Sequence, residues 1–266
     1  MIDGALPYLR CPLCRQGLER VERSLRCPAG HSFDMAKQGY ADLTAGRMPH
    51  VGDTAEMVAD RAEFLSAGHY DFIADALAAA VAGVAGLIVD AGVGTGRYLA
   101  RALDSAPAAT GLGLDVSKPA LRRAARSHGR AAAVLTDLWR PLPLADGVAD
   151  VILNVFAPRN GAEFHRVLRP DGVLLVVTPA PDHLHELIAA YGLIQVDPDK
   201  EVRVHDALSP RFEPIASLVL RRDLELTGDE TRTLIGMTPS AHHVPDVPAT
   251  PGQVTASVQL TTYRPL

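Results

Sequence analysis

Short apolar runs alternate with amphipathic stretches through most of the chain after residue 86. The runs rich in branched residues predict strands, and the stretches with a 3.6-residue period predict helices. Repeated strand–helix–strand units indicate a mostly parallel sheet with helices on both faces, so the predicted fold class is α/β. The expected strands are 87–90, 110–115, 131–135, 148–154 and 172–178, and the expected helices are 96–104, 118–127, 160–168 and 182–191.

The chain on either side of this alternation also has a regular pattern. Before it, residues 72–82 predict a helix, and Thr54 can cap an earlier one. The residues of that earlier helix expected to face inward are Met57, Val58, Phe64 and Leu65. After the alternation, residues 215–226 and 254–263 predict a hairpin-like pair of strands at one sheet edge, with a helix over 228–236.

A glycine-rich turn follows the first predicted strand and leads into a helix. Strand, glycine turn and helix allow the backbone to approach a nucleotide-like ligand at the helix N-terminus. The spacing is D-x-G-x-G-x-G and not the G-x-G-x-x-G of a dinucleotide site, and it resembles motif I of class I S-adenosylmethionine-dependent methyltransferases. The cofactor-binding residues predicted in this turn are Asp90, Gly92, Gly94, Thr95 and Gly96.

Two acidic residues after the next strands extend the predicted nucleoside site. Asp115 ends the second strand, where a carboxylate can accept both ribose hydroxyls. Asp137 follows the third strand, whose tip meets the adenine in this fold, so its carboxylate can accept from the exocyclic amine. A loop acid that caps the chain from Trp139 onward is an equally favoured interpretation of Asp137. The alternative for the whole stretch is a generic Rossmann-type turn with a solvated acid.

Every cysteine of the chain lies in one N-terminal pattern, C-x2-C-x12-C-x3-H. Two pairs of ligands about a dozen residues apart suit tetrahedral zinc bound by three thiolates and one imidazole. Such a site has no open position, so we expect a structural ion whose binding energy folds a segment too small for its own core. The predicted ligands are Cys11, Cys14, Cys27 and His31.

Charge limits the partners that the whole molecule can attract. The net charge of −5 gives no overall field toward nucleic acid or an anionic membrane. Residues 1–50 differ, because seven basic against five acidic residues leave them at +2. On charge alone, we favour a solvated, self-neutralised surface over a polyanion-binding hairpin for the bridge between the two ligand pairs. That bridge contains Glu19 and Glu22 together with Arg15, Arg20, Arg23 and Arg26.

No stretch of the sequence is long enough to span a membrane as a helix. The longest apolar run, 76–89, has 14 residues, whereas about 18–20 are needed. The N-terminus lacks the basic-then-apolar pattern of a signal peptide, and the odd number of cysteines argues against a disulfide scaffold. We therefore expect a cytoplasmic protein with no membrane partner.

Several stretches together resemble one family, the 23S ribosomal RNA (guanine-N1)-methyltransferases, which include the macrolide (tylosin-type) resistance enzymes. The resemblance runs from residue 11 to about residue 240, and the cysteine–histidine pattern with F-D-M-A-K-Q-G-Y is its most specific part. Val93 stands where the family usually has cysteine, and the last 25 residues match weakly. Besides the cysteine–histidine pattern, the matching stretches are 31–40, 52–57, 64–70, 90–96, 113–118, 156–158, 178–187 and 237–239.

The resemblance implies a Rossmann-like class I methyltransferase domain over residues 51–266, with a mostly parallel seven-stranded sheet. It implies a small zinc-finger RNA-recognition domain with a linker over residues 1–50. The reaction implied is methyl transfer from S-adenosylmethionine to N1 of a guanine in a hairpin of 23S ribosomal RNA, and a homodimer is left open. The cofactor contacts implied are Tyr70, Gly94, Thr95 and His183. Taken alone, Tyr70 would be a packed helix end and His183 a helix-start histidine.

Two residues after the fourth strand are expected to face the methyl donor. Asn154 can hold a base edge, and Phe156 can stack on an extruded guanine, an interaction worth about 1–3 kcal/mol. The sequence does not identify the proton acceptor, the nucleotide methylated, the oligomeric state, or whether the outcome is housekeeping modification or drug resistance. Two other classes compete: a small-molecule methyltransferase with a structural finger, and a non-catalytic zinc-ribbon protein that kept a nucleoside pocket.

Overall fold

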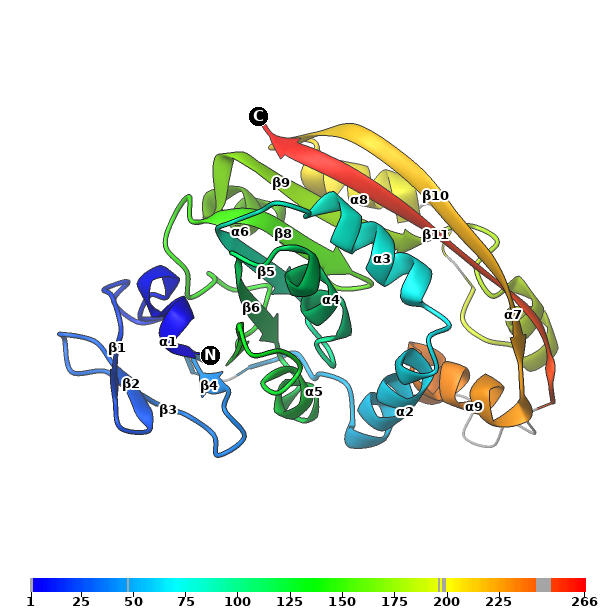
Figure 1. The fold of residues 1–266 in the computed structure, drawn as a ribbon, viewed down its shortest axis with the longest axis horizontal. Coiled ribbons are helices and arrows are strands. Elements are labelled where there is room, and N and C mark those ends of the chain that lie inside the picture. Colours follow the sequence, from blue (N-terminus) through cyan, green and yellow to red (C-terminus); the bar gives the residue numbers. More distant parts are fainter. Residues whose placement is uncertain (1, 47, 196, 198–199, 243–249) are drawn as a thin grey trace.

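An eight-stranded sheet forms the centre of the computed structural model, which describes residues 2–46, 48–195, 197, 200–242 and 250–266 (Figure 1). Its strands follow the order β10-β11-β9-β8-β5-β6-β7-β4. The five strands predicted from apolar runs are confirmed, and they pair in parallel. They are β5 (Leu87–Ala91), β6 (Thr110–Asp115), β7 (Ala131–Leu135), β8 (Ala149–Val155) and β9 (Leu168–Pro179).

Helices cover both faces of this sheet, as the alternation of elements predicts. The helices of the first face are α3 (Asp71–Ala80), α4 (Arg97–Ser105) and α5 (Lys118–Ala124), and those of the second are α6 (Gly161–Val167) and α8 (Lys200–Leu208). Ile88 on β5 packs in one hydrophobic cluster with residues of α3, α4 and α5, whereas its neighbours Leu87 and Val89 pack in the other cluster. The near-continuous apolar character of β5 follows from this burial on two sides.

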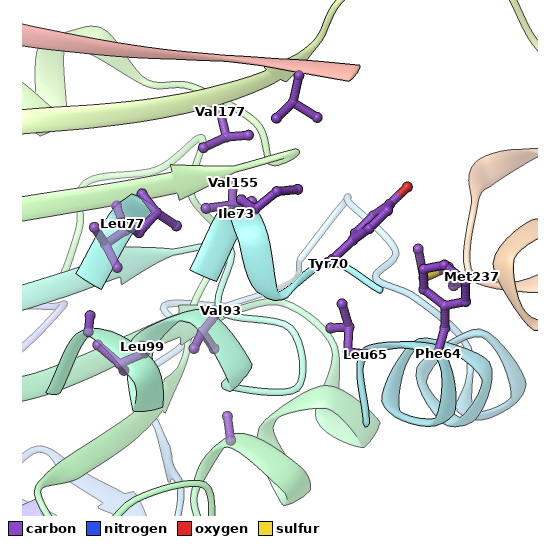
Figure 2. Packing of buried hydrophobic residues seen from close by; sticks show 14 of the residues in the cluster. Phe64, Leu65, Tyr70, Ile73, Leu77, Val93, Leu99, Val155, Val177 and Met237 are labelled. Atoms are coloured by element: carbon purple, nitrogen blue, oxygen red, sulfur yellow. The ribbon is translucent and has the colours of Figure 1, made fainter. Parts of the chain in front are cut away.

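Two further helices pack together beside the carboxyl ends of the strands. The Thr54 hydroxyl accepts the Met57 N–H at 3.3 Å and begins α2 (Ala55–Ser66), and the four residues predicted to face inward are all buried. Thr227 and Glu230 form a reciprocal capping box at the start of α9 (Gly228–Gly236). Figure 2 shows Phe64 and Leu65 of α2 near Met237, which follows α9.

The C-terminal strands form the long hairpin at one edge of the sheet (Figure 1). β11 (Gly252–Pro265) lies antiparallel between β9 and β10 (Phe212–Leu226), which confirms the predicted terminal pair. An antiparallel strand inserted at this place is typical of the methyltransferase version of the fold. α7 (His185–Tyr191) is shorter than predicted, and α8 was not predicted at all.

The N-terminal lobe begins with α1 (Ile2–Ala5) and a 3-10 turn (Leu6–Tyr8). A three-stranded antiparallel ribbon follows, and then β4 (Ala41–Asp42) pairs in parallel with β7. The seven strands expected in residues 51–266 are confirmed as β5 to β11, and β4 from the N-terminal segment adds an eighth at the edge of the sheet. A strand of two residues carries no alternating pattern from which it could be predicted. The ribbon strands are β1 (Glu19–Val21), β2 (Ser24–Arg26) and β3 (Ser32–Asp34).

This lobe shares a hydrophobic core with the sheet. Leu25 and Phe33 of the ribbon belong to the same cluster as Leu112 and Val134 of the central strands. The lobe is also bound at its base, where Leu9 forms an antiparallel bridge with Leu144. A domain boundary at residue 50 stays a prediction, since the packing is continuous across it. Within the described ranges, no helix combines the length and the apolar character that a membrane crossing requires.

Candidate active site and metal centre

The glycine turn between β5 and α4 requires its glycines for steric reasons. Gly92, Gly94 and Gly96 have φ angles of 98°, 52° and 86°, in the left-handed region that side chains disfavour. A Cβ added to Gly92 would lie 2.3 Å from the Cβ of Ala157, in the turn after β8. The sequence therefore makes the backbone of this turn accessible and lets it approach the neighbouring turn closely.

Asp115 at the end of β6 is bonded directly to the glycine turn. Its Oδ2 accepts the Gly94 N–H at 2.8 Å, and its Oδ1 accepts the Ser117 N–H at 2.8 Å. Burial raises the pKa of the Asp115 carboxyl, although these backbone N–H groups oppose the shift. Each carboxylate oxygen has a second lone pair. Asp115 can therefore hold the turn in place and still accept the two ribose hydroxyls of a nucleoside.

Asp90 lies beneath the turn and does not line the cavity that the turn borders. Its side chain is 1% exposed, and within the described residues neither carboxylate oxygen has a hydrogen-bond partner. Burial, with a smaller contribution from the charge of Asp115, raises the pKa of Asp90 to about 8. The group is therefore largely protonated at neutral pH. A direct contact between Asp90 and a cofactor stays a prediction.

A cavity of about 710 Å³ opens at the carboxyl ends of the central strands. This volume is in the range of small-ligand sites, about 300–1,000 Å³, and the position is where open α/β sheets bind ligands. Asp90 and Gly96 are the two predicted cofactor residues that the structure does not place on its wall. The predicted residues that do line it are Tyr70, Gly92, Gly94, Thr95, Asp115, Asp137 and His183.

Three aromatic side chains form one wall of the cavity. The Tyr70 hydroxyl lies 3.4 Å from His183 Nε2, and the Ser257 N–H donates to His183 Nδ1 at 3.2 Å. With Nδ1 accepting the Ser257 N–H, the second ring nitrogen of His183 faces the Tyr70 hydroxyl. Burial raises the pKa of Tyr70 well above its usual range, so the phenol keeps its proton. Figure 2 shows the Tyr70 ring between Val155 and the pair Phe64 and Met237.

Phe156 completes this wall from the turn after β8. Its ring is stacked against His183 with centroids 6.0 Å apart, and it is 42% exposed. Its φ angle of 52° is unusual for a bulky residue, a kind of strain that accumulates at functional sites. An exposed ring held in this way can stack on a planar base, as the sequence predicts.

Asn154, by contrast, does not reach the cavity, and its predicted contact with a base edge is wrong. The side chain is fully buried, and its amide donates to the carbonyls of Ala91 at 3.0 Å and Pro158 at 2.9 Å. These two bonds connect the end of β5 to the turn after β8. The sequence placed Asn154 correctly at the strand end, but the side chain's direction depends on which neighbouring carbonyls need a donor.

Asp137 combines the two interpretations that the sequence left open. Its Oδ1 accepts the Trp139 N–H at 3.0 Å, which is the capping role, and the residue also lines the cavity. Its Oδ2 lies 2.8 Å from His50 Nδ1, and the His50 ring lies near the half-exposed Trp139 ring with centroids 6.3 Å apart. A contact with adenine stays a prediction for Asp137, because both oxygens already have protein partners.

The remaining wall comes from residues to which the sequence assigned no role. Arg61 on α2 pairs with Asp53 before that helix, and its Nη2 donates to the Met237 carbonyl at 2.8 Å. Arg61 thereby joins the linker, α2 and the turn after α9 beside Gly94. In the sequence, 52–57 indicates a helix start and 237–239 enters only through the family resemblance. Nothing in their composition indicates that they meet.

The four predicted metal ligands lie together in the N-terminal lobe. One ligand atom from each can be chosen so that all lie within 4.8 Å of one another. His31 Nδ1 lies 3.5 Å from Cys11 Sγ and 3.3 Å from Cys27 Sγ, and Cys14 Sγ lies 3.6 Å from Cys27 Sγ. A tetrahedral zinc ion with ordinary bond lengths requires edges of about 3.5–3.8 Å. The donor set and its spacing therefore fit structural zinc.

Two of the four arginines in the bridge between the two ligand pairs already have hydrogen-bond or ion-pair partners within the protein. Arg15 donates to the carbonyls of Leu142 at 2.7 Å and Leu144 at 2.6 Å, which anchors the lobe to the sheet. Arg20 pairs with Asp3 at 2.9 Å. These contacts support the self-neutralised interpretation for half of the bridge.

Comparison with known proteins agrees with this geometry. Residues 9–45 match the family model described as RlmA, N-terminal, and residues 88–172 match that of a methyltransferase domain. The complex of the Haloferax volcanii Trm112 methyltransferase activator with a provisionally named methyltransferase has a similar fold. The TM-score is 0.55 at 16% identity, over 81% of this chain and 98% of that one. Fold and site define a class I S-adenosylmethionine-dependent methyltransferase with an N-terminal zinc ribbon.

Full-length relatives specify the family. The chain is 47% identical to the 23S rRNA (guanine(748)-N(1))-methyltransferase of Streptomyces fradiae, over 100% of both chains. It is 54% identical, again over 100% of both, to a Micromonospora griseorubida protein provisionally named a 23S rRNA (guanine-N(1)-)-methyltransferase. The chain belongs to the 23S rRNA (guanine-N1)-methyltransferase family. Its cofactor is S-adenosylmethionine, for which the accessible glycine turn, the ribose acceptor and the cavity volume are suited.

Proposed function

We propose that this protein transfers the methyl group of S-adenosylmethionine to N1 of a guanine in a hairpin of 23S ribosomal RNA. The observation that carries the proposal is that one chain combines a cofactor cavity with a zinc ribbon. A nucleoside cavity at the strand ends and a Cys₃His cluster in a lobe packed against the same sheet occur in a protein related over its full length to the Streptomyces fradiae enzyme. A zinc ribbon packed against the catalytic sheet is unnecessary for a small-molecule substrate.

The cofactor, when bound, supplies a methyl group on a positively charged sulfur. N1 of the guanine attacks this methyl group in line as the carbon–sulfur bond breaks, the sulfur leaves as a neutral thioether, and the N1 proton is lost to a base. Catalysis then depends mainly on alignment of the reacting atoms. The Asp115 carboxylate and the glycine turn orient the nucleoside, and Tyr70 with His183 borders the other side of the cavity. Phe156 offers its exposed ring to an extruded guanine. Hydrogen bonds within the protein hold Asp115, Tyr70 and His183 in place and so favour a fixed reaction geometry.

The finer parts of the proposal concern partners and location. The substrate is a hairpin whose target guanine must leave its stack, and the N-terminal lobe presents it to the cavity. Action on ribosomal RNA implies a cytoplasmic protein. Protection against macrolides is the proposed consequence in the host, and it can be measured as the minimal inhibitory concentration of tylosin in a sensitive strain that expresses the gene.

A homodimer is part of the same proposal. The outer strand β10 has no neighbour on one side within the described sheet, and Ile215, Leu218 and Val219 are each more than half exposed. An exposed apolar edge can pair with a second copy. Light scattering should give twice the chain mass, and Leu218→Lys with Val219→Lys should return the monomer. A monomeric wild type would refute the homodimer and leave the proposed methyl transfer to RNA unaffected.

Labelled S-adenosylmethionine and deproteinised 23S ribosomal RNA from a strain without this modification test the main proposal. We expect incorporation into RNA and a single primer-extension stop at one guanine, because an N1-methyl group blocks the base-pairing edge. Label in small molecules but none in RNA would favour the small-molecule methyltransferase. Calorimetry that shows no binding of S-adenosylmethionine would favour the non-catalytic zinc-ribbon protein.

A further inference from the structure

Exposed arginines without an ion pair or side-chain hydrogen bond to a described residue are concentrated in two places, the ribbon and the end of α5. Most described arginines are paired, as Arg97 is with Asp71 and Arg101 with Asp75. The described arginines without an ion pair or side-chain hydrogen bond are Arg23, Arg26, Arg122, Arg123, Arg126 and Arg211. Three of these belong to α5 or the turn directly after it. In a chain of net charge −5, such a cluster is unlike the rest of the surface.

The α5 arginines lie on the side of the helix that faces solvent. Ala120, Leu121 and Ala124 are buried against the sheet, whereas Arg122, Arg123 and Arg126 are exposed. Arg122 and Arg123 lie in the last turn of α5, and Arg126 lies in the turn directly after it. The Arg126 N–H donates to the Arg123 carbonyl at 2.9 Å, which continues the helical path to that residue. The positive charges thus form a stripe and not a scattered set.

The N-terminal end of α5, five residues before Arg122, lies at the rim of the cofactor cavity. Ser117 caps α5 by accepting the Ala120 N–H, and its hydroxyl donates to the Asp53 carbonyl at 2.8 Å. Asp53 and Asp115, two residues before Ser117, both line the cavity. A polyanion that follows α5 would consequently reach the cavity mouth.

The C-terminal end of α5, where the arginines lie, meets the N-terminal lobe. The turn at residues 36–40 is closed by the Gly39 N–H, which donates to the Ala36 carbonyl at 2.9 Å. A Cβ on Gly39 would lie 3.7 Å from that of Ala125, so this turn packs on the end of α5. Lys37 in the turn is exposed and makes no ion pair with a described residue. Figure 1 shows α5 between the ribbon strands and α2.

We propose that Lys37, Arg122, Arg123 and Arg126 form the surface that binds the phosphates of the substrate RNA between the zinc lobe and the cavity. The inference rests on the proposed function and deepens it. The bridge arginines Arg15 and Arg20 are poorly suited to the same task, since protein carbonyls and Asp3 occupy them. Guanidinium groups without internal partners can take phosphate oxygens without breaking any contact.

Salt-dependent binding to deproteinised 23S ribosomal RNA tests the surface. We expect Arg122→Gln with Arg126→Gln to weaken binding roughly tenfold or more near 0.1 M KCl. The slope of log affinity against log salt should fall in magnitude by about 1.4–1.8, since each of the two lost phosphate contacts removes about 0.7–0.9. Arg211→Gln is the matched control, because Arg211 is equally exposed and unpaired but lies beside the C-terminal Leu266. It should leave affinity and slope unchanged.

Two further measurements keep the inference separate from its premise. Thermal unfolding and S-adenosylmethionine binding of the double variant should match wild type, because neither arginine contacts the core or the cavity. Wild-type affinity and slope in the double variant, or an equal loss in Arg211→Gln, would overturn the proposed surface while leaving the proposed function intact. Failure of the wild type to bind or methylate the RNA would instead refute the proposed function.

Discussion

The zinc ligands all come from residues 11–31, whereas the walls of the cofactor cavity come from segments spread between His50 and Ser240. Two short turns bring the cysteine and histidine side chains together, and a bound ion completes the cluster. The cavity exists only when the sheet, α2 and the turn after α9 are assembled, with Arg61 connecting them. A substitution in the zinc cluster should therefore leave cofactor binding unchanged, whereas the effect of a substitution in the cavity should depend on which wall it alters.

Loss of zinc should have the largest effect on RNA methylation. Cys27→Ser, or prolonged chelation, removes the ion that holds the ribbon, so we expect RNA methylation to disappear. S-adenosylmethionine binding should persist, since no zinc ligand lines the cavity. Metal content, calorimetry with the cofactor and RNA labelling measure the three effects. His185→Ala, a change of an exposed histidine, should keep the zinc, and full activity without zinc would contradict the expectation.

A methyl group on the glycine turn should have the next largest effect. Gly92→Ala places a Cβ 2.3 Å from that of Ala157, so the two turns must separate, and we expect cofactor affinity to fall by about 100-fold. Gly83→Ala is the matched control, because its φ of 83° is similarly left-handed but its Cβ would meet nothing within 4 Å.

Both glycine variants should lose about 1–2 kcal/mol of stability from backbone strain. Gly92→Ala should lose cofactor binding in addition, and Gly83→Ala should not. Calorimetry with S-adenosylmethionine separates the two effects from each other. Equal cofactor affinity in the two variants would show that the close approach of the turns is dispensable, and zinc content should be unchanged in both.

The contrast between the two sites also explains which of them the sequence could predict. Ligand identity and spacing specify the cysteine–histidine cluster, and branched apolar runs specify the five parallel strands, because those signals are local. Asp115 was predictable because strand ends share one sheet edge. The contributions of His50 and Arg61 were not, since these side chains reach the cavity through tertiary packing. Asn154 failed for the same reason: the carbonyls of Ala91 and Pro158, which determine its direction, are set by the fold.

Asp90, which lies beneath the glycine turn, should make the stability of the protein depend on pH without affecting the zinc lobe. Its pKa is about 8 in the folded protein, against 3.8 for an exposed carboxyl. The unfolded chain releases this proton near pH 4 and the folded protein keeps it until about pH 8, so the contribution of Asp90 to stability is fully present below pH 4 and is lost as the pH rises through 8. We expect unfolding free energy without cofactor to fall by about 1 kcal/mol per unit between pH 5 and 7.5.

Asp90→Asn should flatten this dependence, because the amide does not ionise. Urea unfolding at several pH values measures it. Asp206→Asn, an exposed change on α8, should retain the wild-type slope. A wild-type stability that is constant across this range would show that Asp90 is charged in the folded protein. Zinc content should not differ between the two variants.

The smallest expected effect is at the junction of the two sites. Arg15 donates to the carbonyls of Leu142 and Leu144, which also accept from Arg166, so Arg15→Gln should remove the bonds to the lobe but leave both acceptors paired, at a cost of about 1 kcal/mol. The KM for RNA should rise several-fold, because the lobe is held less firmly against the sheet. Zinc content and cofactor affinity should stay at wild-type values, since Arg15 belongs to neither site. Arg20→Gln, which removes exposed contacts with Asp3 and the Glu22 carbonyl, is the matched control and should change none of these quantities. If cofactor affinity fell in Arg15→Gln, the lobe and the cavity would be coupled through residues 142–144, and the separation between a local metal site and an assembled cavity would not hold.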